Sequence, residues 1–441
     1  MIIGRETFVP CMRLGRIRFA MKFSKDKVFG FLHQKYINLF AYWYSALKTL
    51  IFISFTLNPT AFFDGAVLTH NSFAKPKPIL PGAYQLELYL NQLKDKKVAI
   101  VANQTSCIEK VHLLDTLLKL KVNVVKIFSP EHGFRGQADA GESISDSKDK
   151  NTGIPVISLY GDLKKPSASD MEGIDVVVFD IQDVGVRFYT YISTLHYVME
   201  SCAIFKKKLI LLDRPNPNAN YVDGPILEKA YTSFVGMHPV PIVYGMTIGE
   251  YGQMINGQYW LPDSLQCDLS IIPIKNYKHT SEYKLPIPPS PNLKSNLSIQ
   301  LYPSLCLFEG TTISVGRGTQ FPFEVYGHPQ FPKTNFSFMP VPQTGAKHPL
   351  HVNQCCNGYD LYCRLNGKID KLNLSYLIQA LQLLGAQQLF ADHGDFFNLL
   401  AGTGKLKEQL ISGMNEQEIR ATWQPDLNDF LKIRSKYLIY P

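Results

Sequence analysis

Residues 122–136 read V-N-V-V-K-I-F-S-P-E-H-G-F-R-G, and this stretch decides how we expect the chain to fold. Its first seven residues are mostly β-branched or apolar, as in a buried strand, and Pro130 ends the run. A carboxylate, an imidazole and a guanidinium follow in Glu131, His132 and Arg135. Open α/β sheets bind ligands beyond the carboxyl ends of their strands, so these side chains are expected at a binding edge. A polar turn in which Glu131 merely pairs with Arg135 is the alternative.

An apolar run that ends in polar residues recurs along the first half of the chain. We predict a strand from each of five runs: 98–102, 122–128, 155–160, 175–180 and 208–213. Predicted helices separate several of them, and this alternation favours a parallel sheet covered on both faces. We therefore expect a Rossmann-like α/β domain. No G-x-G-x-x-G motif follows the first strand, so no dinucleotide or other cofactor is predicted.

The composition of the chain changes after residue 214. Residues 215–350 are rich in Pro, Gly, Tyr and Phe, and their one clear predicted helix, 247–257, begins with a capping box of Thr247 and Glu250. Beyond residue 365, helices are expected at 374–384 and 408–420. The length of 441 residues is typical of two domains. We predict a leader and linker over 1–79, a Rossmann-like catalytic domain over 80–230, and a smaller α/β (α+β) domain over 231–441 that completes the cleft.

The positive charge of the chain is concentrated at its N-terminus. The net charge is +8, and residues 1–50 contain nine lysines and arginines against two acidic residues. The remainder is nearly neutral, which argues against nucleic acid as a partner.

A short apolar segment, residues 49–57, follows this basic region. It is shorter than the ~20 residues that span a bilayer, and its basic flank and the small residues after it are typical of a secretory signal. The basic lead is unusually long. A later start of translation, an uncleaved anchor, and an amphipathic segment on a cytoplasmic protein are therefore alternatives. We expect export to the periplasm or cell surface, with membrane contact only through this segment if it is retained.

The eight cysteines form no C-x-x-C pair, and no histidine lies at zinc-finger spacing around them. We predict no metal site and interpret most of the cysteines as buried thiols. In an exported protein, Cys363 could form a disulfide with Cys355 or Cys356.

Polar side chains follow every predicted strand. The carboxyl ends of parallel strands share one edge of a sheet, so these side chains are expected to line a polar cleft. Structural roles are the alternatives: Asn103 could hold its own turn, and Asp183 could pair with Arg187 at the start of a helix. The candidates are Asn103, Glu131, His132, Arg135, Asp180, Gln182, Asp183, Arg187 and Tyr189.

A second polar group lies farther along the chain, among aromatic residues. It comprises His238, Glu309, Arg317 and Glu324. Sugar rings present an apolar face and a rim of hydroxyl groups, which suits interleaved aromatic and polar side chains. Ordinary packing is the alternative for any single aromatic residue.

Five motifs together resemble the exo-β-N-acetylmuramidase NamZ family, over most of the chain from residue 98 to beyond 358. Residues 1–48 are not part of the pattern. The resemblance implies a Rossmann-like domain, a smaller C-terminal domain and an active site between them. It also implies a glycosidase that releases N-acetylmuramic acid from the non-reducing end of peptidoglycan fragments. The motifs are S-P-E-H-G-F-R-G (129–136), F-D-I-Q-D-V-G-x-R-F-Y-T-Y (179–191), L-D-R-P-N-P (212–217), E-G-T-x-x-S-x-G-R-G-T (309–319) and P-F-E (322–324).

Glycosidic cleavage requires an acid for the leaving oxygen, and a second carboxylate or the substrate's own acetamido group for the sugar cation. We expect Glu131 to be the acid and Asp183 the second carboxylate, with Asp180 as its competitor. Glu309 and Glu324 remain candidate partners, and whether the outcome is inversion or retention is left open.

The lactyl carboxylate of N-acetylmuramic acid suits an arginine fork. Candidates for that role are Arg135, Arg187 and Arg317, and further substrate contacts are expected from Asn103, His132, Gln182, Tyr189 and His238. A metal-dependent hydrolase and a non-catalytic muropeptide-binding protein are the rival interpretations.

Overall fold

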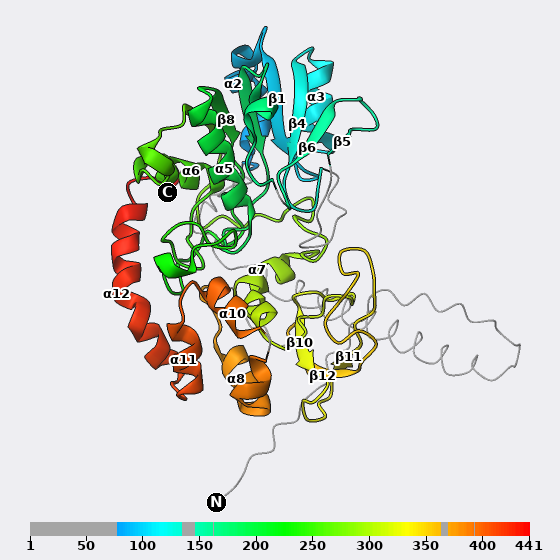
Figure 1. The fold of residues 1–441 in the computed structure, drawn as a ribbon, viewed down its shortest axis with the longest axis vertical. Helices are drawn as coiled ribbons and strands as arrows, with labels where there is room; N and C mark the ends of the chain where they lie inside the picture. Colours follow the sequence, from blue (N-terminus) through cyan, green and yellow to red (C-terminus); the bar gives the residue numbers. More distant parts are fainter. Residues whose placement is uncertain (1–76, 135–145, 162, 363–368, 392) are drawn as a thin grey trace, which may run out of the picture. The chain divides into compact units, whose positions relative to one another are not determined.

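The computed structural model describes residues 77–134, 146–161, 163–362, 369–391 and 393–441, and Lys77–Pro441 form one compact unit (Figure 1). The predicted apolar segment, Arg135 and Cys363 lie outside the described residues. Cys355 and Cys356 carry free thiols. Among the helices that the structure describes, none is both long and apolar enough to cross a bilayer.

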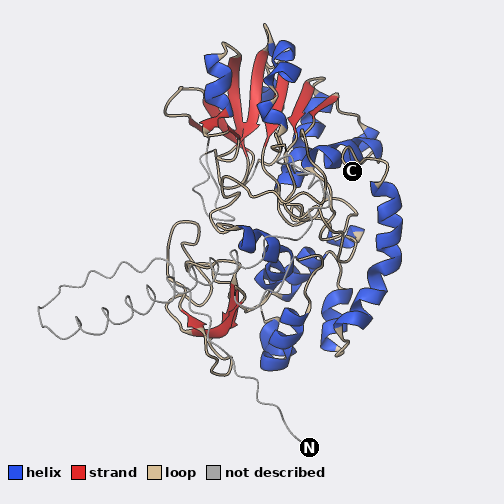
Figure 2. Ribbon diagram, turned by 180° about the vertical axis from the view of Figure 1, so that it is seen from behind, coloured by secondary structure: helices blue, strands red, loops and turns tan. Residues whose placement is uncertain are grey.

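Seven strands form the central sheet, in the order β5-β6-β4-β1-β7-β8-β9 (Figure 2). Every neighbouring pair is parallel except β5 with β6. The five predicted strands and the α/β fold class are confirmed. The strands are β1 (Lys97–Ala102), β4 (Asn123–Ser129), β5 (Ser147–Lys148), β6 (Pro155–Ser158), β7 (Val176–Asp180), β8 (Lys208–Leu212) and β9 (Leu269–Ile272).

The edge strand β9 was not predicted. It pairs with β8 although it lies beyond residue 230. The sheet therefore takes a strand from the part of the chain that we assigned to the second domain.

Helices cover both faces of the sheet because its strands are apolar on both faces. On one face, Val98 and Ile100 share a core with α2 (Leu86–Leu93) and α3 (Leu113–Lys119). On the other face, α5 (Tyr191–Ile204) and α6 (Ile248–Gly257) contribute to the larger core. The predicted capping box at the start of α6 is confirmed.

The chain beyond β9 forms helices and a small antiparallel sheet. Helix α7 (Asn296–Leu305) runs directly into a 3-10 helix, η4 (Cys306–Gly310). The small sheet has the order β10-β12-β11, from Val325–His328, Cys356–Asp360 and Ser337–Phe338. Shorter elements are η1 (Gly82–Tyr84), β2 (Cys107–Ile108), β3 (Val111–His112), α4 (Ala168–Met171), η2 (Lys229–Tyr231) and η3 (Pro262–Ser264).

Five helices follow this sheet: α8 (Ser375–Leu384), α9 (Ala386–Leu389), α10 (Gly394–Ala401), α11 (Lys405–Ile411) and α12 (Glu416–Arg434). The predicted helix at 408–420 is wrong, because α11 ends before Gly413, whose φ is +82°. Asn415 then caps α12 by accepting hydrogen bonds from two N–H groups of its first turn. At the other end of α12, Arg434 donates to the carbonyl oxygen of Gly245, just before α6.

Candidate active site

A cavity of about 880 Å³ lies beyond the carboxyl end of the sheet. Glu131 and His132, which follow β4, line it together with Phe188, Tyr189 and Thr190, which follow β7. The second half of the chain supplies the rest of the lining. These residues include Tyr302, Cys306, Glu309, Arg317, Phe323, Lys347, His348, Phe396 and Leu400. The cavity is therefore built by both halves of the chain, as a cleft at a sheet edge would be.

Glu131 occupies the turn directly after β4. Its Oε2 atom accepts a hydrogen bond of 2.6 Å from the hydroxyl group of Thr190, and its side chain is half-buried. The next residue, His132, is buried and has a φ of +69°, and Gly133 follows at +76°. A non-glycine residue in this left-handed region is uncommon, and such strain occurs preferentially at functional sites. The strained turn fixes the carboxylate of Glu131 at the cavity wall.

Glu309 is the second carboxylate that lines the cavity. Its Oε1 atom lies 2.5 Å from Nε of Arg317, and its Oε2 atom lies 3.4 Å from the thiol of Cys306. Burial alone would lower the pKa of Arg317, but the adjacent Glu309 outweighs this effect and the pKa is raised. The guanidinium therefore stays charged, and it lies 5.1 Å from the centre of the Phe323 ring. The pair is nearly neutral as a unit, yet keeps polar atoms at the cavity surface.

Aromatic rings form much of the cavity wall. Tyr189 packs edge-on against Tyr302, which in turn packs edge-on against Phe323. The hydroxyl group of Tyr189 donates to the carbonyl oxygen of Pro289 over 2.9 Å. Burial raises the pKa of Tyr189 well above its usual value, so the phenol stays neutral. The wall thus offers apolar faces beside carboxylates and cations, as a sugar ring requires.

Two family models match almost all of the folded chain. The N-terminal model of the exo-β-N-acetylmuramidase NamZ matches residues 98–297, and the C-terminal model matches residues 300–440. The chain belongs to the exo-β-N-acetylmuramidase NamZ family. It is 37% identical over 377 residues to the peptidoglycan β-N-acetylmuramidase NamZ of Bacillus subtilis (strain 168). The aligned residues cover 80% of this chain and 89% of that protein.

Two solved structures of DUF1343 family proteins from Bacteroides fragilis NCTC 9343 have the same fold as this NamZ-family chain. Their TM-scores are 0.76 and 0.71, at sequence identities of 46% and 28%. Each comparison covers 82% of this chain and 99% of the other protein.

Asp180 lies in a NamZ motif, but the prediction that it is a catalytic carboxylate is not supported. It is fully buried at the end of β7 and does not line the cavity. Its two oxygens accept from Nε and Nη2 of Arg214, over 2.5 and 2.8 Å. A buried carboxylate that is paired on both oxygens serves the structure of the turn rather than proton transfer.

Asp183, the predicted second carboxylate, is also buried and does not line the cavity. Its Oδ2 atom accepts hydrogen bonds from the hydroxyl group of Tyr244 and from the N–H group of Gly185. Its Oδ1 atom is buried without a hydrogen-bond partner among the described residues. Burial raises the pKa of this carboxyl group from 3.8 to about 6, against the lowering effect of its hydrogen bonds.

Arg187, a predicted ligand of the lactyl carboxylate, does not line the cavity, so the structure does not support this role. The side chain is fully buried, and its terminal nitrogens donate to the carbonyl oxygens of Pro225, Val240, Leu400 and Ala401 over 2.6–3.1 Å. Burial lowers the pKa of this guanidinium to about 9. Its role is to join the segment around residue 225 to the end of α10. The alternative of an Asp183–Arg187 pair is not observed, because the hydrogen bonds of both side chains go to other partners.

Asn103 and Gln182 form hydrogen bonds that stabilise turns, and they do not line the cavity. Asn103 is fully buried, and its Oδ1 atom accepts from the N–H and hydroxyl groups of Thr105 over 2.9 and 2.6 Å, which is the structural alternative for this residue. The side-chain amide of Gln182 donates to the carbonyl oxygen of Pro215 over 2.7 Å. Neither residue lines the cavity, so the structure does not support the substrate contacts that were predicted for Asn103 and Gln182.

His238 and Glu324 also lie outside the cavity lining. The ring of His238 is buried within 2.9 Å of the ring nitrogen of His196, and burial lowers its pKa well below the usual value. Glu324 is buried and accepts from the hydroxyl group of Ser295 over 2.5 Å. The predicted substrate roles of these two residues are therefore not supported.

The structure brings together five of the predicted site residues in one cavity: Glu131, His132, Tyr189, Glu309 and Arg317. Sequence reasoning missed Thr190, although it stands in a quoted motif, because nothing in the sequence pairs it with Glu131. It also missed Lys347 and His348, which lie in a segment with no recognisable pattern. Within the described ranges, no three His, Cys, Asp or Glu side chains gather in the way that a metal site requires.

Proposed function

We propose that this chain is an exo-β-N-acetylmuramidase, which releases N-acetylmuramic acid from the non-reducing end of peptidoglycan fragments. The 37% identity to a peptidoglycan β-N-acetylmuramidase over 89% of that protein's length carries the proposal. The cavity supports it, because two carboxylates, cations and aromatic rings line a space large enough for a small ligand. No cofactor takes part in this chemistry.

Glu131 is the proposed general acid. It is the one carboxylate on the sheet side of the described cavity, and it is positioned by Thr190. Its proton passes to the glycosidic oxygen as the bond to the leaving sugar breaks. The partner is then either Glu309 in the same cavity or the acetamido group of the substrate, since Asp180 and Asp183 do not line the cavity.

Arg317 is the proposed ligand for the lactyl carboxylate. Of the three predicted arginines, it is the one in the described part of the chain that lines the cavity. Its fork binds Glu309 through Nε. The other nitrogens of a guanidinium can then face a second carboxylate. The salt bridge with Glu309 orients the guanidinium before the substrate binds. This orientation lowers the entropic cost of binding.

The test is hydrolysis of a chromogenic N-acetylmuramic acid glycoside, with the N-acetylglucosamine analogue as the comparison. The native chain should release the chromogen from the first substrate and far less from the second. Glu131→Gln should lower turnover by at least about 10²-fold, the usual contribution of a general acid. Thr190→Val, which removes only the hydrogen bond to Glu131, serves as the milder control.

Near-normal turnover by the Glu131→Gln protein would remove Glu131 from the acid role. Binding of muropeptides without any product would favour a non-catalytic protein.

We also propose that the chain is exported to the periplasm or cell surface, with membrane contact only through residues 49–57 if that segment is retained. The basic flank, the short apolar run and the small residues after it support this. N-terminal sequencing of the protein from fractionated source cells tests it. A start shortly after the apolar run, in the exported fraction, is expected, and an intact Met1 in the cytosol would refute the proposal.

A further inference from the structure

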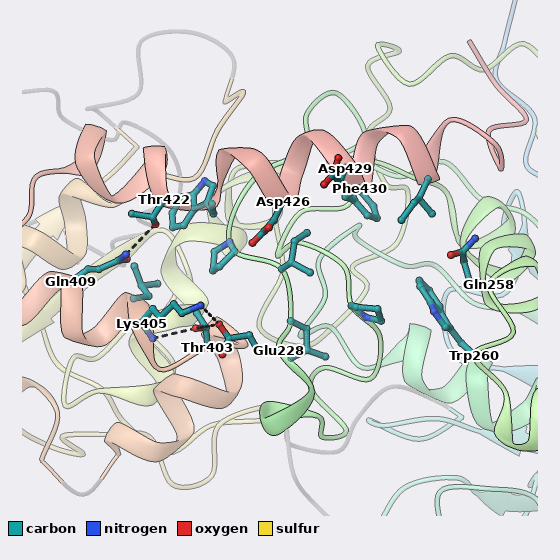
Figure 3. Close-up of a pocket in the computed structure, with 17 residues that line it drawn as sticks. Glu228, Gln258, Trp260, Thr403, Lys405, Gln409, Thr422, Asp426, Asp429 and Phe430 are labelled. Carbon is teal, nitrogen blue, oxygen red and sulfur yellow. Dashed lines mark hydrogen bonds and ion pairs between the residues drawn. The ribbon is translucent and has the colours of Figure 1, made fainter.

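A second hollow in the described structure lies along α12 and shares no lining residue with the catalytic cavity. It has a volume of about 450 Å³, which is within the range of small-molecule sites. Figure 3 shows Glu228, Thr403 and Lys405 at one end of this groove, and Gln258 and Trp260 at the other. Asp426 and Phe430 project from α12 between these ends. We propose that this groove is a second, non-catalytic binding site for neutral N-acetylglucosamine-containing oligosaccharide.

The apolar part of the groove contains two indole rings. Trp260 is half-buried, and one face of its ring is stacked on His238 at 4.7 Å between ring centres, with planes 18° apart. This stacking fixes the ring, so the part that lines the groove is a rigid apolar platform. Trp423 and Phe430 of α12 also line the groove, although only 4% of each side chain is exposed. A sugar ring packs its C–H face against such a surface.

The polar part of the groove favours a neutral ligand. Lys405 is the one basic residue that lines the described groove, and its charge is neutralised by Glu228 at 2.8 Å. Glu228 also accepts a hydrogen bond from Thr403 over 3.0 Å. Asp429 is paired with Lys432 at 2.8 Å on the solvent side. An anionic sugar would therefore meet no unpaired lysine or arginine among the residues that line the described groove.

Asp426 supplies the hydrogen-bond acceptor that a sugar hydroxyl requires. It is exposed, lines the groove, and makes no hydrogen bond or ion pair with the residues that the structure describes. An ionised carboxylate accepts hydrogen bonds only, so its natural partners are hydroxyl and amide N–H groups of a ligand. A neutral amino sugar offers both groups beside an apolar ring face. The lactyl group of N-acetylmuramic acid would add repulsion to Asp426.

Tryptophan fluorescence reports on this groove selectively. The chain has three tryptophans, of which Trp260 and Trp423 line the groove and Trp43 lies outside the described residues. No tryptophan lines the catalytic cavity in the part of the chain that is described. Titration of the full chain carrying Trp43→Phe with tetra-N-acetylchitotetraose should therefore give a saturable change in fluorescence. N-acetylmuramic acid should bind the groove at least about tenfold more weakly, by the same measurement.

Substitutions of groove residues, with a control on α12, separate loss of this site from general effects on the protein. Asp426→Ala should weaken chitotetraose binding about tenfold, the usual effect of losing one hydrogen bond to a charged group. Asn428→Ala, on the same helix but outside the groove lining, should leave binding unchanged. Trp260→Ala should abolish binding when it is measured by calorimetry. All three variants should hydrolyse the chromogenic glycoside at the normal rate.

Three outcomes would overturn the proposal: no saturable fluorescence change, equal affinities of the Asp426→Ala and Asn428→Ala proteins, or N-acetylmuramic acid binding as tightly as chitotetraose. The titration requires no turnover. Failure of the groove proposal is therefore distinct from failure of the muramidase proposal.

Discussion

Replacement of Asp183 by Asn should stabilise the protein above neutral pH. The carboxyl group is buried, its Oδ2 atom accepts two hydrogen bonds, and its Oδ1 atom has no partner among the described residues. The oxygen of an Asn side chain can accept the same two hydrogen bonds from Tyr244 and Gly185. Its NH₂ group then takes the place of Oδ1, so one polar atom stays unpartnered as before. What the substitution removes is the charge.

The pKa shift sets the size of the effect. Burial raises the pKa of Asp183 in the folded chain to about 6, from the ordinary value of 3.8 that applies to the unfolded chain. Each pKa unit corresponds to about 1.4 kcal/mol, so the ionised side chain costs the native state about 3 kcal/mol. The sign follows from proton binding. Between about pH 4 and pH 6 the folded chain holds a proton that the unfolded chain has released, so stability falls as pH rises through this window. Above pH 6 the cost is constant.

Urea unfolding of both proteins at pH 4 and pH 8 measures this effect. Other titrating groups, including the buried Asp213 with its raised pKa of about 7, contribute equally to both proteins. The wild-type chain should therefore lose about 3 kcal/mol more than Asp183→Asn between the two pH values. Parallel pH dependence would refute the charge argument. Because Asp183 does not line the cavity, turnover should stay within about tenfold of normal, and a loss of 10²-fold or more would return Asp183 to the catalytic role.

Three further substitutions test how the site is supported. Asp180→Ala leaves the guanidinium of Arg214 buried without its partner, and should lower the free energy of unfolding in urea by about 3–5 kcal/mol. Arg187→Met removes the arginine donors from four buried carbonyl oxygens, of which that of Val240 keeps the N–H group of Leu227, and should cost at least about 3 kcal/mol by the same measurement. Gly185→Ala should lower the melting temperature sharply, because φ is +76° and a Cβ atom there would lie 2.2 Å from the Asn216 side chain; an unchanged melting temperature would contradict this geometry.

The sheet could be predicted from sequence because its strands carry their own signal. Five of the strands are apolar runs that end in polar residues, and burial on both faces requires such runs. Strand β9 was missed because its alternation is weak and Pro273 follows it at once. Helix α7 was missed because it contains Pro303, which is unfavourable inside a helix. Both elements are held by long-range packing, and local patterns do not report it.

The cavity could be predicted only in part, because one sequence pattern serves two structural roles. Some polar residues at strand ends line the cavity. Others hold the turns that position the residues of the first group. Glu131 lines the cavity, whereas Asp180 holds a turn because Arg214 of the next strand end reaches it over 2.5 Å. The sequence shows that Glu131 and Asp180 both follow strands. It does not show which of the two forms an ion pair with a residue from a neighbouring strand end.

The supporting residues are as specific to the site as the residues that line it. Asp180 with Arg214 ties together the ends of β7 and β8, and Arg187 ties the segment after β8 to the end of α10. Leu400, whose carbonyl oxygen Arg187 binds, itself lines the cavity. A buried charge is costly unless it is paired or hydrogen-bonded, so removal of either partner from these contacts should disturb the walls of the cleft. A sequence motif that contains both Glu131 and these supporting residues therefore indicates the cavity. Only the burial of each residue in the folded chain shows which residues of the motif can contact a sugar.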